Sequence, residues 1–204
     1  MKNIFKIIVL LIAIGAKAQS PIIDFEDYKP VTLAGNRVKG AYYKDTKNQL
    51  NAYEGTYIYT NGTTSLKIIL KKMMSTVPTN LYYEDIIVGE YQYIENGVEK
   101  INTFSKFNIG SPYKNTLHTI KGNLLLQGTE LGCPDCAPTE KRLNVGFVDI
   151  PSHSNASPQI RIITSAGKSA IKFSFHWEMR MHKEGDPPNI NPILPMGEYI
   201  LIKQ

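Results

Sequence analysis

The stretch 53–72, YEGTYIYTNGTTSLKIILKK, decides the fold of this chain. Two runs of alternating apolar and polar residues flank Asn61-Gly62, a dipeptide that favours a type I′ hairpin turn because both residues tolerate a positive φ angle. With these two residues as the turn, Tyr57 pairs with Leu66 across the hairpin. This register sorts most apolar side chains to one face, as a half-buried antiparallel sheet requires. The stretch therefore predicts a β-hairpin with one buried face.

A second Asn-Gly dipeptide stands at 96–97. A two-residue turn at this point would mix polar and apolar side chains on both faces of the hairpin. A three-residue loop over 95–97 instead pairs Tyr91 with Ile101, so we expect the longer loop. The apolar residues change from one alternating set of positions to the other at Gly89, which predicts a bulge or bend in the strand there.

The clearest strand pattern lies at 171–179, where five large apolar residues, among them the only Trp, alternate with polar ones. A shorter apolar stripe lies earlier, at 143–147, and Gly122-Asn123 is a plausible turn. A last strand at 198–203 ends the chain. Four prolines in 183–195 exclude a helix or a central strand from that stretch. About nine or ten strands in sequential hairpins favour an all-β antiparallel up-and-down barrel, lipocalin-like, with a β-sandwich as the alternative.

Residues 1–18 have the features of a signal peptide. Lys2 and Lys6 precede an unbroken apolar run at 7–14, and Ala-Lys-Ala at 16–18 fits the small-x-small cleavage pattern. The apolar run is shorter than the roughly 20 residues that a membrane-spanning helix needs. We therefore expect export to the periplasm or the medium, with no transmembrane segment in the mature chain.

Removal of this segment takes away Lys2, Lys6 and Lys17 and no acidic residue, so the formal charge falls from +5 towards neutrality. A chain this close to neutral has little attraction for phosphate backbones, and nucleic acid is not an expected partner. The remaining length suits one domain. We expect a lead-in at 19–51 that packs on the sheet, followed by a single antiparallel β domain at 52–204.

Several short motifs occur together in the first half of the chain. They are Tyr42-Tyr43-Lys44-Asp45, Leu50, Gly55-Thr56-Tyr57, the Asn61-Gly62 turn, and Gly89-Glu90-Tyr91-Gln92-Tyr93 before Asn96-Gly97. Over 40–105 this set resembles an uncharacterised family of small exported proteins of Gram-negative bacteria that carry a domain of unknown function. The resemblance implies an exported all-β domain and supplies no activity. Separately, Gly55-Thr56-Tyr57 is similar to the Gly-x-Trp that opens lipocalin barrels, with Tyr in place of Trp.

Cys133 and Cys136 form the only cysteine pair, and this CxxC has three interpretations. A redox motif needs Cys133 at a helix N-terminus, but Pro138 would then lie five residues into that helix. A structural zinc site needs four ligands, and the chain has no second cysteine pair. The oxidising compartment that an exported protein reaches favours a disulfide that closes a tight loop, and we therefore expect a Cys133–Cys136 disulfide.

No catalytic motif is recognisable, and we expect no catalytic, cofactor or metal site. His176 and His182 are about 20 Å apart if they lie on one strand, too far to share a metal ion. His118 borders an apolar strand and is expected at the surface or at an edge. Neighbouring Glu84 and Asp85 would point to opposite faces of a strand, and 45–48 reads as a turn rather than a calcium loop.

The chain has twelve tyrosines, of which five on predicted strands suit either a binding face or the core: Tyr53, Tyr57, Tyr59, Tyr91 and Tyr93. Tyrosine is a good strand residue, so core packing is the favoured interpretation. We expect Tyr53, Tyr57, Leu66 and Phe173 to point inward.

From these patterns we expect an exported, non-catalytic protein that binds a small apolar ligand inside the barrel. The alternative is an envelope-associated module that binds a protein or glycan partner through an exposed sheet face. A filled interior would favour the alternative, and a lined void would favour the ligand carrier.

Overall fold

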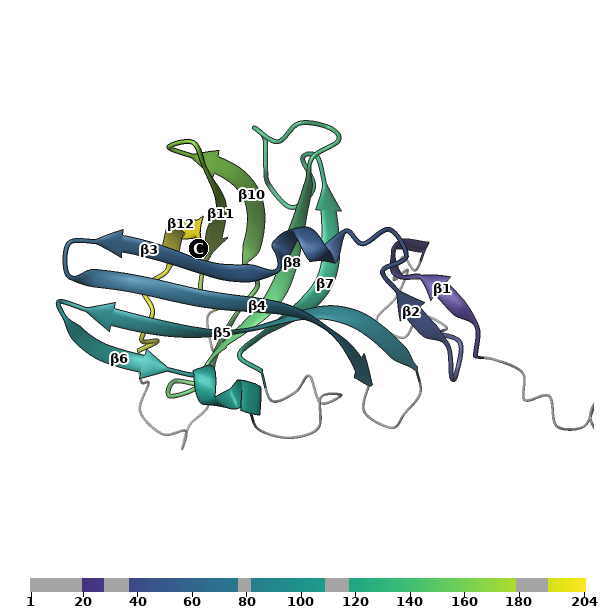
Figure 1. The fold of residues 1–204 in the computed structure, drawn as a ribbon, viewed down its shortest axis with the longest axis horizontal. Coiled ribbons are helices and arrows are strands. Elements are labelled where there is room, and N and C mark those ends of the chain that lie inside the picture. Colours follow the sequence, from purple (N-terminus) through teal and green to yellow (C-terminus); the bar gives the residue numbers. More distant parts are fainter. Residues whose placement is uncertain (1–19, 28–36, 77–81, 109–117, 179–190) are drawn as a thin grey trace, which may run out of the picture.

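The computed structural model describes residues 20–27, 37–76, 82–108, 118–178 and 191–204. These residues form an all-β protein with a single mixed sheet of twelve strands and three short 3-10 helices (Figure 1). The strands are β1 (Ile22–Asp24), β2 (Tyr42–Lys44), β3 (Gly55–Asn61), β4 (Thr64–Thr76), β5 (Tyr83–Glu95), β6 (Val98–Asn102), β7 (Ile120–Gln127), β8 (Lys141–Asp149), β9 (Ser154–Ala156), β10 (Gln159–Ser165), β11 (Lys168–Phe175) and β12 (Gly197–Lys203), and the 3-10 helices are η1 (Phe25–Asp27), η2 (Leu50–Tyr53) and η3 (Phe104–Asn108). The predicted all-β class is confirmed.

Eight strands form a closed ring, in which each strand pairs antiparallel with the next. The order is β3, β4, β5, β7, β8, β10, β11 and β12, and β12 pairs back with β3. The order around the ring is therefore the order along the chain, as sequential hairpins predict. β6 pairs with β5 and β9 with β8, off the ring. The described strands outnumber those predicted because three-residue strands such as β1, β2 and β9 are too short to show an alternating pattern.

The N-terminal segment, defined here as residues 20–27 and 37–53, joins the edge of the sheet. β1 pairs parallel with β2, and β2 pairs parallel with β5, so the sheet is mixed rather than purely antiparallel. After β2 the chain turns at Asp45, whose carboxylate accepts hydrogen bonds from the backbone N–H groups of Gln49 (2.8 Å) and Leu50 (2.9 Å). The turn expected at 45–48 is present, and it leads into η2.

The β3–β4 hairpin differs from the predicted register by two residues. Tyr57 pairs with Ile68, and Leu66 pairs with Tyr59, because the turn consists of Gly62 (φ 58°) and Thr63 rather than Asn61-Gly62. A shift of two residues keeps every side chain on its face, so Tyr57 and Leu66 are buried as expected. Tyr53 is also buried, but it lies in η2 and not in a strand.

The β5–β6 hairpin has a two-residue turn, and the predicted three-residue loop is wrong. Asn96 (φ 52°) and Gly97 (φ 79°) occupy the turn, and the flanking residues 95 and 98 pair directly. The register then shifts beside Tyr93, which pairs with Ile101. This bulge inserts one extra residue, and it restores the sorting of polar and apolar side chains that a regular two-residue hairpin would have lost.

Two glycines predicted to interrupt strands lie inside them. Gly89 continues the regular β4–β5 register without a bulge, and a Cβ atom there would approach Leu70 Cδ2 to 2.6 Å and Ile120 Cβ to 3.2 Å. Gly89 therefore permits the close approach of β4 and β7 to β5. Gly122 belongs to β7, where the register with β8 shifts between Lys121 and Leu124, so the expected Gly122-Asn123 turn is a bulge instead.

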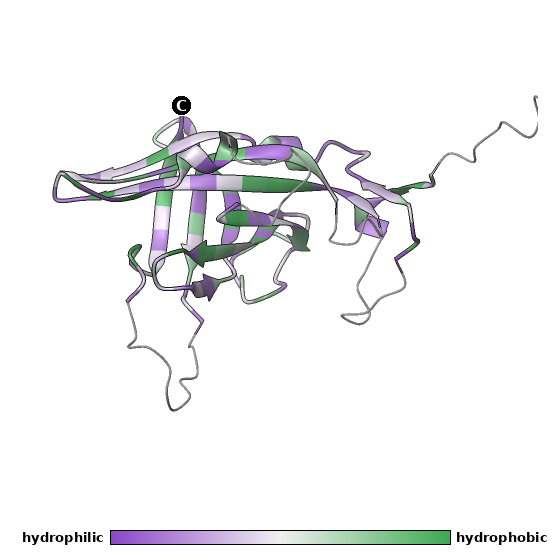
Figure 2. Cartoon of the chain, turned by 90° about the horizontal axis from the view of Figure 1, so that it is seen from below, coloured by the Kyte–Doolittle hydropathy of each residue, from purple (hydrophilic) through white to green (hydrophobic). Residues whose placement is uncertain are grey.

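The buried side chains of all eight ring strands pack into one cluster. Phe147 lies within this cluster, with ring centroids 5.1 Å from Tyr91, 5.4 Å from Phe175 and 5.0 Å from Trp177. Along several strands, hydrophilic and hydrophobic residues alternate (Figure 2), which places one face of each of these strands in the core. β5 differs, because its residues 85–91 are all buried. Phe173 points inward as expected. Of the predicted strand and proline-rich stretches, Met179 and 183–190 lie outside the described residues.

No helix in the described part of the chain has the length and apolarity that a membrane crossing requires.

Candidate functional site

A pocket of about 420 Å³ lies where the N-terminal segment meets β5 and β7. We call it the seam pocket. Its volume falls within the range of roughly 300–1,000 Å³ that is typical of small-molecule sites.

The apolar part of the seam pocket combines two distant stretches of the chain. Phe25 in η1 and Tyr43 in β2 are both buried and belong to the core cluster. Leu125 packs against the same cluster from β7, and its neighbour Leu124 is 47% exposed. The pocket therefore has an apolar floor that is continuous with the core, and an apolar side chain at its rim.

One polar wall is built around the ion pair between Arg37 and Glu84, with 2.8 Å between Nη1 and Oε2. The Arg37 guanidinium lies 4.2 Å from the ring centroid of Tyr82 and 5.3 Å from that of Tyr43, within range of cation–π attraction. The same Glu84 oxygen accepts a hydrogen bond from Asn123 Nδ2 (3.4 Å). This wall links the N-terminal segment to β5 and β7.

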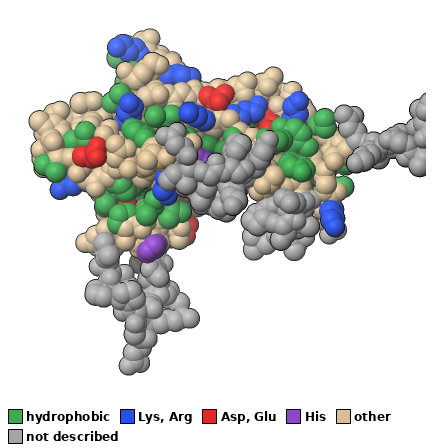
Figure 3. Space-filling view, turned by 60° about the horizontal axis from the view of Figure 1, so that its bottom comes forward, with side chains coloured by type: hydrophobic (Ala, Val, Ile, Leu, Met, Phe, Trp, Pro, Cys, Tyr) green, Lys and Arg blue, Asp and Glu red, His purple; other side chains and the backbone are tan. Residues whose placement is uncertain are grey.

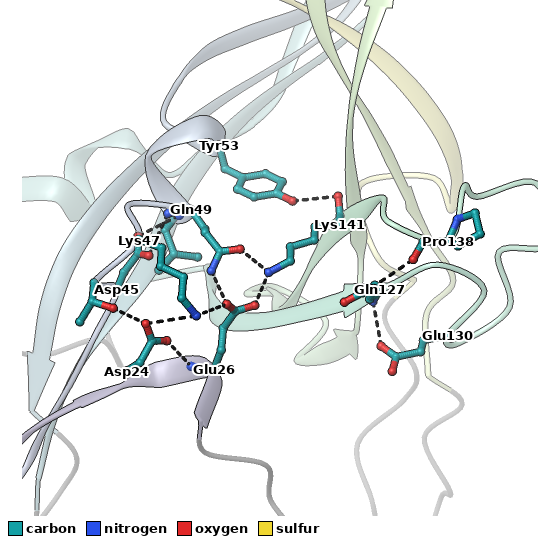
Figure 4. A network of polar contacts seen from close by, with 12 residues as sticks. Asp24, Glu26, Asp45, Lys47, Gln49, Tyr53, Gln127, Glu130, Pro138 and Lys141 are labelled. Atoms are coloured by element: carbon teal, nitrogen blue, oxygen red, sulfur yellow. Dashed lines mark hydrogen bonds and ion pairs between the residues drawn. The ribbon is translucent and has the colours of Figure 1, made fainter.

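A second polar wall is centred on Glu26 (Figure 4). Its carboxylate accepts hydrogen bonds from Lys141 Nζ, Gln49 Nε2 and Lys47 Nζ. Burial raises the pKa of Glu26, but the hydrogen bonds from Lys141, Gln49 and Lys47 outweigh it, so the net pKa lies below the usual value. Glu26 therefore stays ionised and ties η1 to the start of β8.

The remaining polar lining comes from β7 and the loop that follows it. Glu130 accepts a hydrogen bond from the backbone N–H of Gln127 (2.8 Å), and Gln127 Nε2 donates to the carbonyl oxygen of Pro138 (3.2 Å) (Figure 4). Every carboxylate that lines the pocket thus accepts a hydrogen bond from the protein.

The disulfide predicted from the sequence is present between Cys133 and Cys136. It lies in the loop between β7 and β8, and neither cysteine lines the seam pocket. Asp135 lies close to both sulfur atoms, but the sulfurs are bonded to each other and offer no thiolate for a metal ion.

His118, expected at the surface or at an edge, lies two residues before β7 and is largely covered. Its side chain is 9% exposed, and its Nδ1 lies 2.9 Å from the Oε1 atom of fully buried Glu90. Thr119 donates its hydroxyl to the other oxygen of the same carboxylate (2.7 Å). The sequence carried one overlooked signal, which is an acidic residue within the otherwise buried β5. His153 and His176 are exposed, and His182 lies outside the described residues.

The five tyrosines considered as a binding face serve the core. Four of them are buried, and Tyr59 is half-buried with its ring centroid 5.2 Å from that of Tyr199. Glu84 and Asp85, neighbours in β5, reach different partners: Glu84 lines the pocket, whereas Asp85 is buried and accepts hydrogen bonds from Tyr42 and from the backbone of Asp45.

Sequence reasoning missed the residues of the seam pocket as a group. The segments that hold Phe25, Tyr43 and Leu125 are far apart in sequence, and only the parallel β2–β5 pairing and the ring closure between β5 and β7 bring them together.

Fold and pocket together define an all-β protein with a closed ring of strands and a ligand-sized cavity at the seam with its N-terminal segment. The chain belongs to a family described as "Family of unknown function (DUF6705)", which matches residues 1–204. Neither the curated proteins nor the solved structures include a significant match.

Proposed function

We propose that this protein is an exported, non-catalytic binding protein, built as a lipocalin-like up-and-down barrel, that takes a small ligand with an apolar part. The barrel assignment is supported by the identical order of the ring strands in space and in sequence, and by the pairing of β12 with β3. Gly55-Thr56-Tyr57, similar to the lipocalin opening, begins the first strand of the ring.

The seam pocket is the observation that carries this proposal. The side chains of the core cluster occupy the interior of the ring, which was the expected place for the ligand. The seam pocket instead offers a ligand-sized volume, an apolar floor of Phe25, Tyr43 and Leu125, and polar groups at its walls. An apolar body would contact the floor, while a polar end would meet Asn123 or Gln127.

Export is supported by two independent features of the chain. Residues 1–18 have the composition of a signal peptide. The Cys133–Cys136 disulfide fits an oxidising compartment such as the periplasm or the extracellular medium.

A fluorescence titration with a neutral naphthylamine dye tests the ligand site. We expect saturable binding at one site, with a dissociation constant of about 100 μM or below for a dye of this size. Leu124→Arg places a charge at the rim of the seam pocket and should weaken binding at least about tenfold. Ile162→Arg is the matched control, since Ile162 is similarly exposed (41%) but lies on β10, and it should leave binding unchanged. Equal effects of the two substitutions, or no saturable binding, would contradict the proposal.

A second candidate function is an envelope-associated module that binds a protein or glycan through a sheet face. It is favoured by the filled ring and by exposed apolar side chains such as Val98 and Ile162. On the face shown in Figure 3, however, apolar side chains form separate groups among Lys and Arg side chains. In the same titration, this candidate predicts no saturable dye binding.

A further inference from the structure

A second, smaller pocket of about 160 Å³ lies beneath the disulfide loop. We call it the loop pocket. Its floor is the sheet surface formed by β8, β10, β11 and β12, and Gly132, Cys133 and Asp135 from the loop form its wall. It shares no lining residue with the seam pocket, so a ligand bound in one pocket does not occupy the other.

Three cations form a row across the floor of the loop pocket. Arg161 on β10 pairs directly with Arg142 on β8 and with Lys172 on β11. Directly opposed residues in an antiparallel pair have Cβ atoms about 5 Å apart, and like charges at such positions destabilise the sheet. A row of this kind is stable only when negative charge lies close to it.

The protein compensates two of these cations with carboxylates. Arg161 forms ion pairs with Asp135 (2.8 Å) and Glu140, and Lys172 pairs with Glu198 (2.7 Å). These contacts also fix the positions of the two side chains on the floor. Each cation still has N–H groups for which no acceptor is found in the described part of the chain.

Arg142 is the cation of this row that forms no ion pair with a carboxylate among the described residues. Its side chain is 1% exposed, and its guanidinium donates to neutral acceptors: the carbonyl oxygens of Gly128 (2.9 Å) and Glu130, and Gln159 Oε1. Its Nε atom is buried and has no hydrogen-bond partner among the described residues. A guanidinium does not deprotonate in proteins, and a buried charge is costly unless it is paired. Arg142 therefore lacks a negative partner at the edge of an open cavity.

We propose that the loop pocket binds a small tetrahedral oxyanion of the phosphate or sulfate class. Such an anion would supply negative charge beside Arg142 and accept hydrogen bonds from Lys172 Nζ, from Arg161 and from the Ser174 hydroxyl, which lines the same floor. The volume is sufficient, because a water molecule occupies about 30 Å³ and the pocket holds several times that. The site is rigid, since its floor is sheet and its wall is closed by the disulfide.

Isothermal titration calorimetry of the full mature chain with inorganic phosphate, at constant ionic strength set with chloride, tests this site. We expect a dissociation constant of about 1 mM or below. Lys172→Gln should raise it about tenfold, and the control Lys168→Gln, which removes one charge from the exposed start of the same strand, should change it less than about twofold. Absence of phosphate binding, or equal effects of the two variants, would overturn the proposal.

Glu198→Gln separates a binding role from a structural one. Loss of this carboxylate removes a negative charge from the pocket, so phosphate should bind several-fold more tightly. A merely structural row of ion pairs predicts weaker or unchanged binding, which would contradict the site.

Two further binding experiments distinguish a free phosphate compound from the headgroup of a lipid. If the anion is a free solute, glycerol phosphate binds and vesicles of phosphatidylglycerol do not retain the protein. If the group belongs to a lipid, the vesicles retain the wild-type protein and release Lys172→Gln. Retention of both proteins alike, together with no response to either soluble phosphate, would overturn the assignment.

Discussion

The ring and the N-terminal segment share one apolar core, but the segment is attached through charged contacts as well. In the ring, Phe147 contacts Tyr91, Phe175 and Trp177, and burial of aromatic side chains supplies the stability. The N-terminal segment also buries apolar side chains such as Phe25, and it is attached in addition through ion pairs such as Glu26 with Lys141 and Asp45 with Lys72. Loss of an aromatic side chain should therefore affect the ring most, and loss of a charged group should affect the attachment of the segment. Because the seam pocket lies between the two, its shape depends on the polar attachment.

Phe147→Ala should have the largest effect on the ring. Removal of a fully buried aromatic side chain leaves a cavity that its neighbours fill only in part, and we expect a loss of about 3–5 kcal/mol in the free energy of unfolding. Urea denaturation followed by circular dichroism measures it. Val98→Ala, at an exposed position of β6, is the control and should change stability by less than about 0.5 kcal/mol. A loss below about 1 kcal/mol for Phe147→Ala would contradict an aromatic core as the source of stability.

Asp45→Ala should have the largest effect on the N-terminal segment. The buried carboxylate accepts hydrogen bonds from two backbone N–H groups and from Lys72 Nζ (2.9 Å); its removal leaves the two N–H groups without this acceptor and the Lys72 ammonium without its carboxylate. We expect a loss of about 3 kcal/mol in unfolding free energy, together with weaker dye binding in the seam pocket. Asp27→Ala removes an exposed carboxylate from the same segment and serves as the control. If the two variants behave alike, Asp45 does not anchor the segment.

The loop between β7 and β8 is constrained by a covalent bond, the Cys133–Cys136 disulfide, in addition to noncovalent contacts. Cys133→Ser with Cys136→Ser should lower the unfolding free energy by about 2 kcal/mol, the value expected for a loop this short. Dye binding at the seam pocket should be unchanged, whereas phosphate binding at the loop pocket should weaken. A change in dye binding would show that the two pockets are coupled, contrary to this account.

The smallest effect concerns the acid response of the segment. The folded pKa of Glu26 lies below its unfolded value, so its contribution is complete above about pH 5 and is lost as the pH falls through the folded pKa. Glu26→Gln should therefore reduce stability by less than about 1 kcal/mol near neutral pH, and the difference from the wild-type protein should shrink in acid. Thermal midpoints measured between pH 6 and pH 3 test this. A difference that grows in acid would reverse the predicted sign.

The sequence was sufficient to predict which side chains of a strand are buried, because this depends on local alternation. It was not sufficient to predict features that depend on pairing between strands far apart in the chain. The period-two pattern around Tyr57 and Phe173 predicted which side chains are buried, and a two-residue shift in the β3–β4 register did not alter this. The exact turns were wrong because Asn-Gly dipeptides permit more than one register, and the bulge beside Tyr93 has no sequence signal of its own. The two pockets could not be predicted from the sequence, because each one depends on strand pairings that join distant segments, such as Arg142 with Arg161.

The most direct test of the central claim is a crystal structure of the protein soaked with a brominated naphthalene derivative. Anomalous scattering from bromine locates the probe without reference to any expected position. The account predicts one peak in the seam pocket, against Phe25, Tyr43 and Leu125. A peak within the ring, or a saturated crystal without a peak in this pocket, would contradict it.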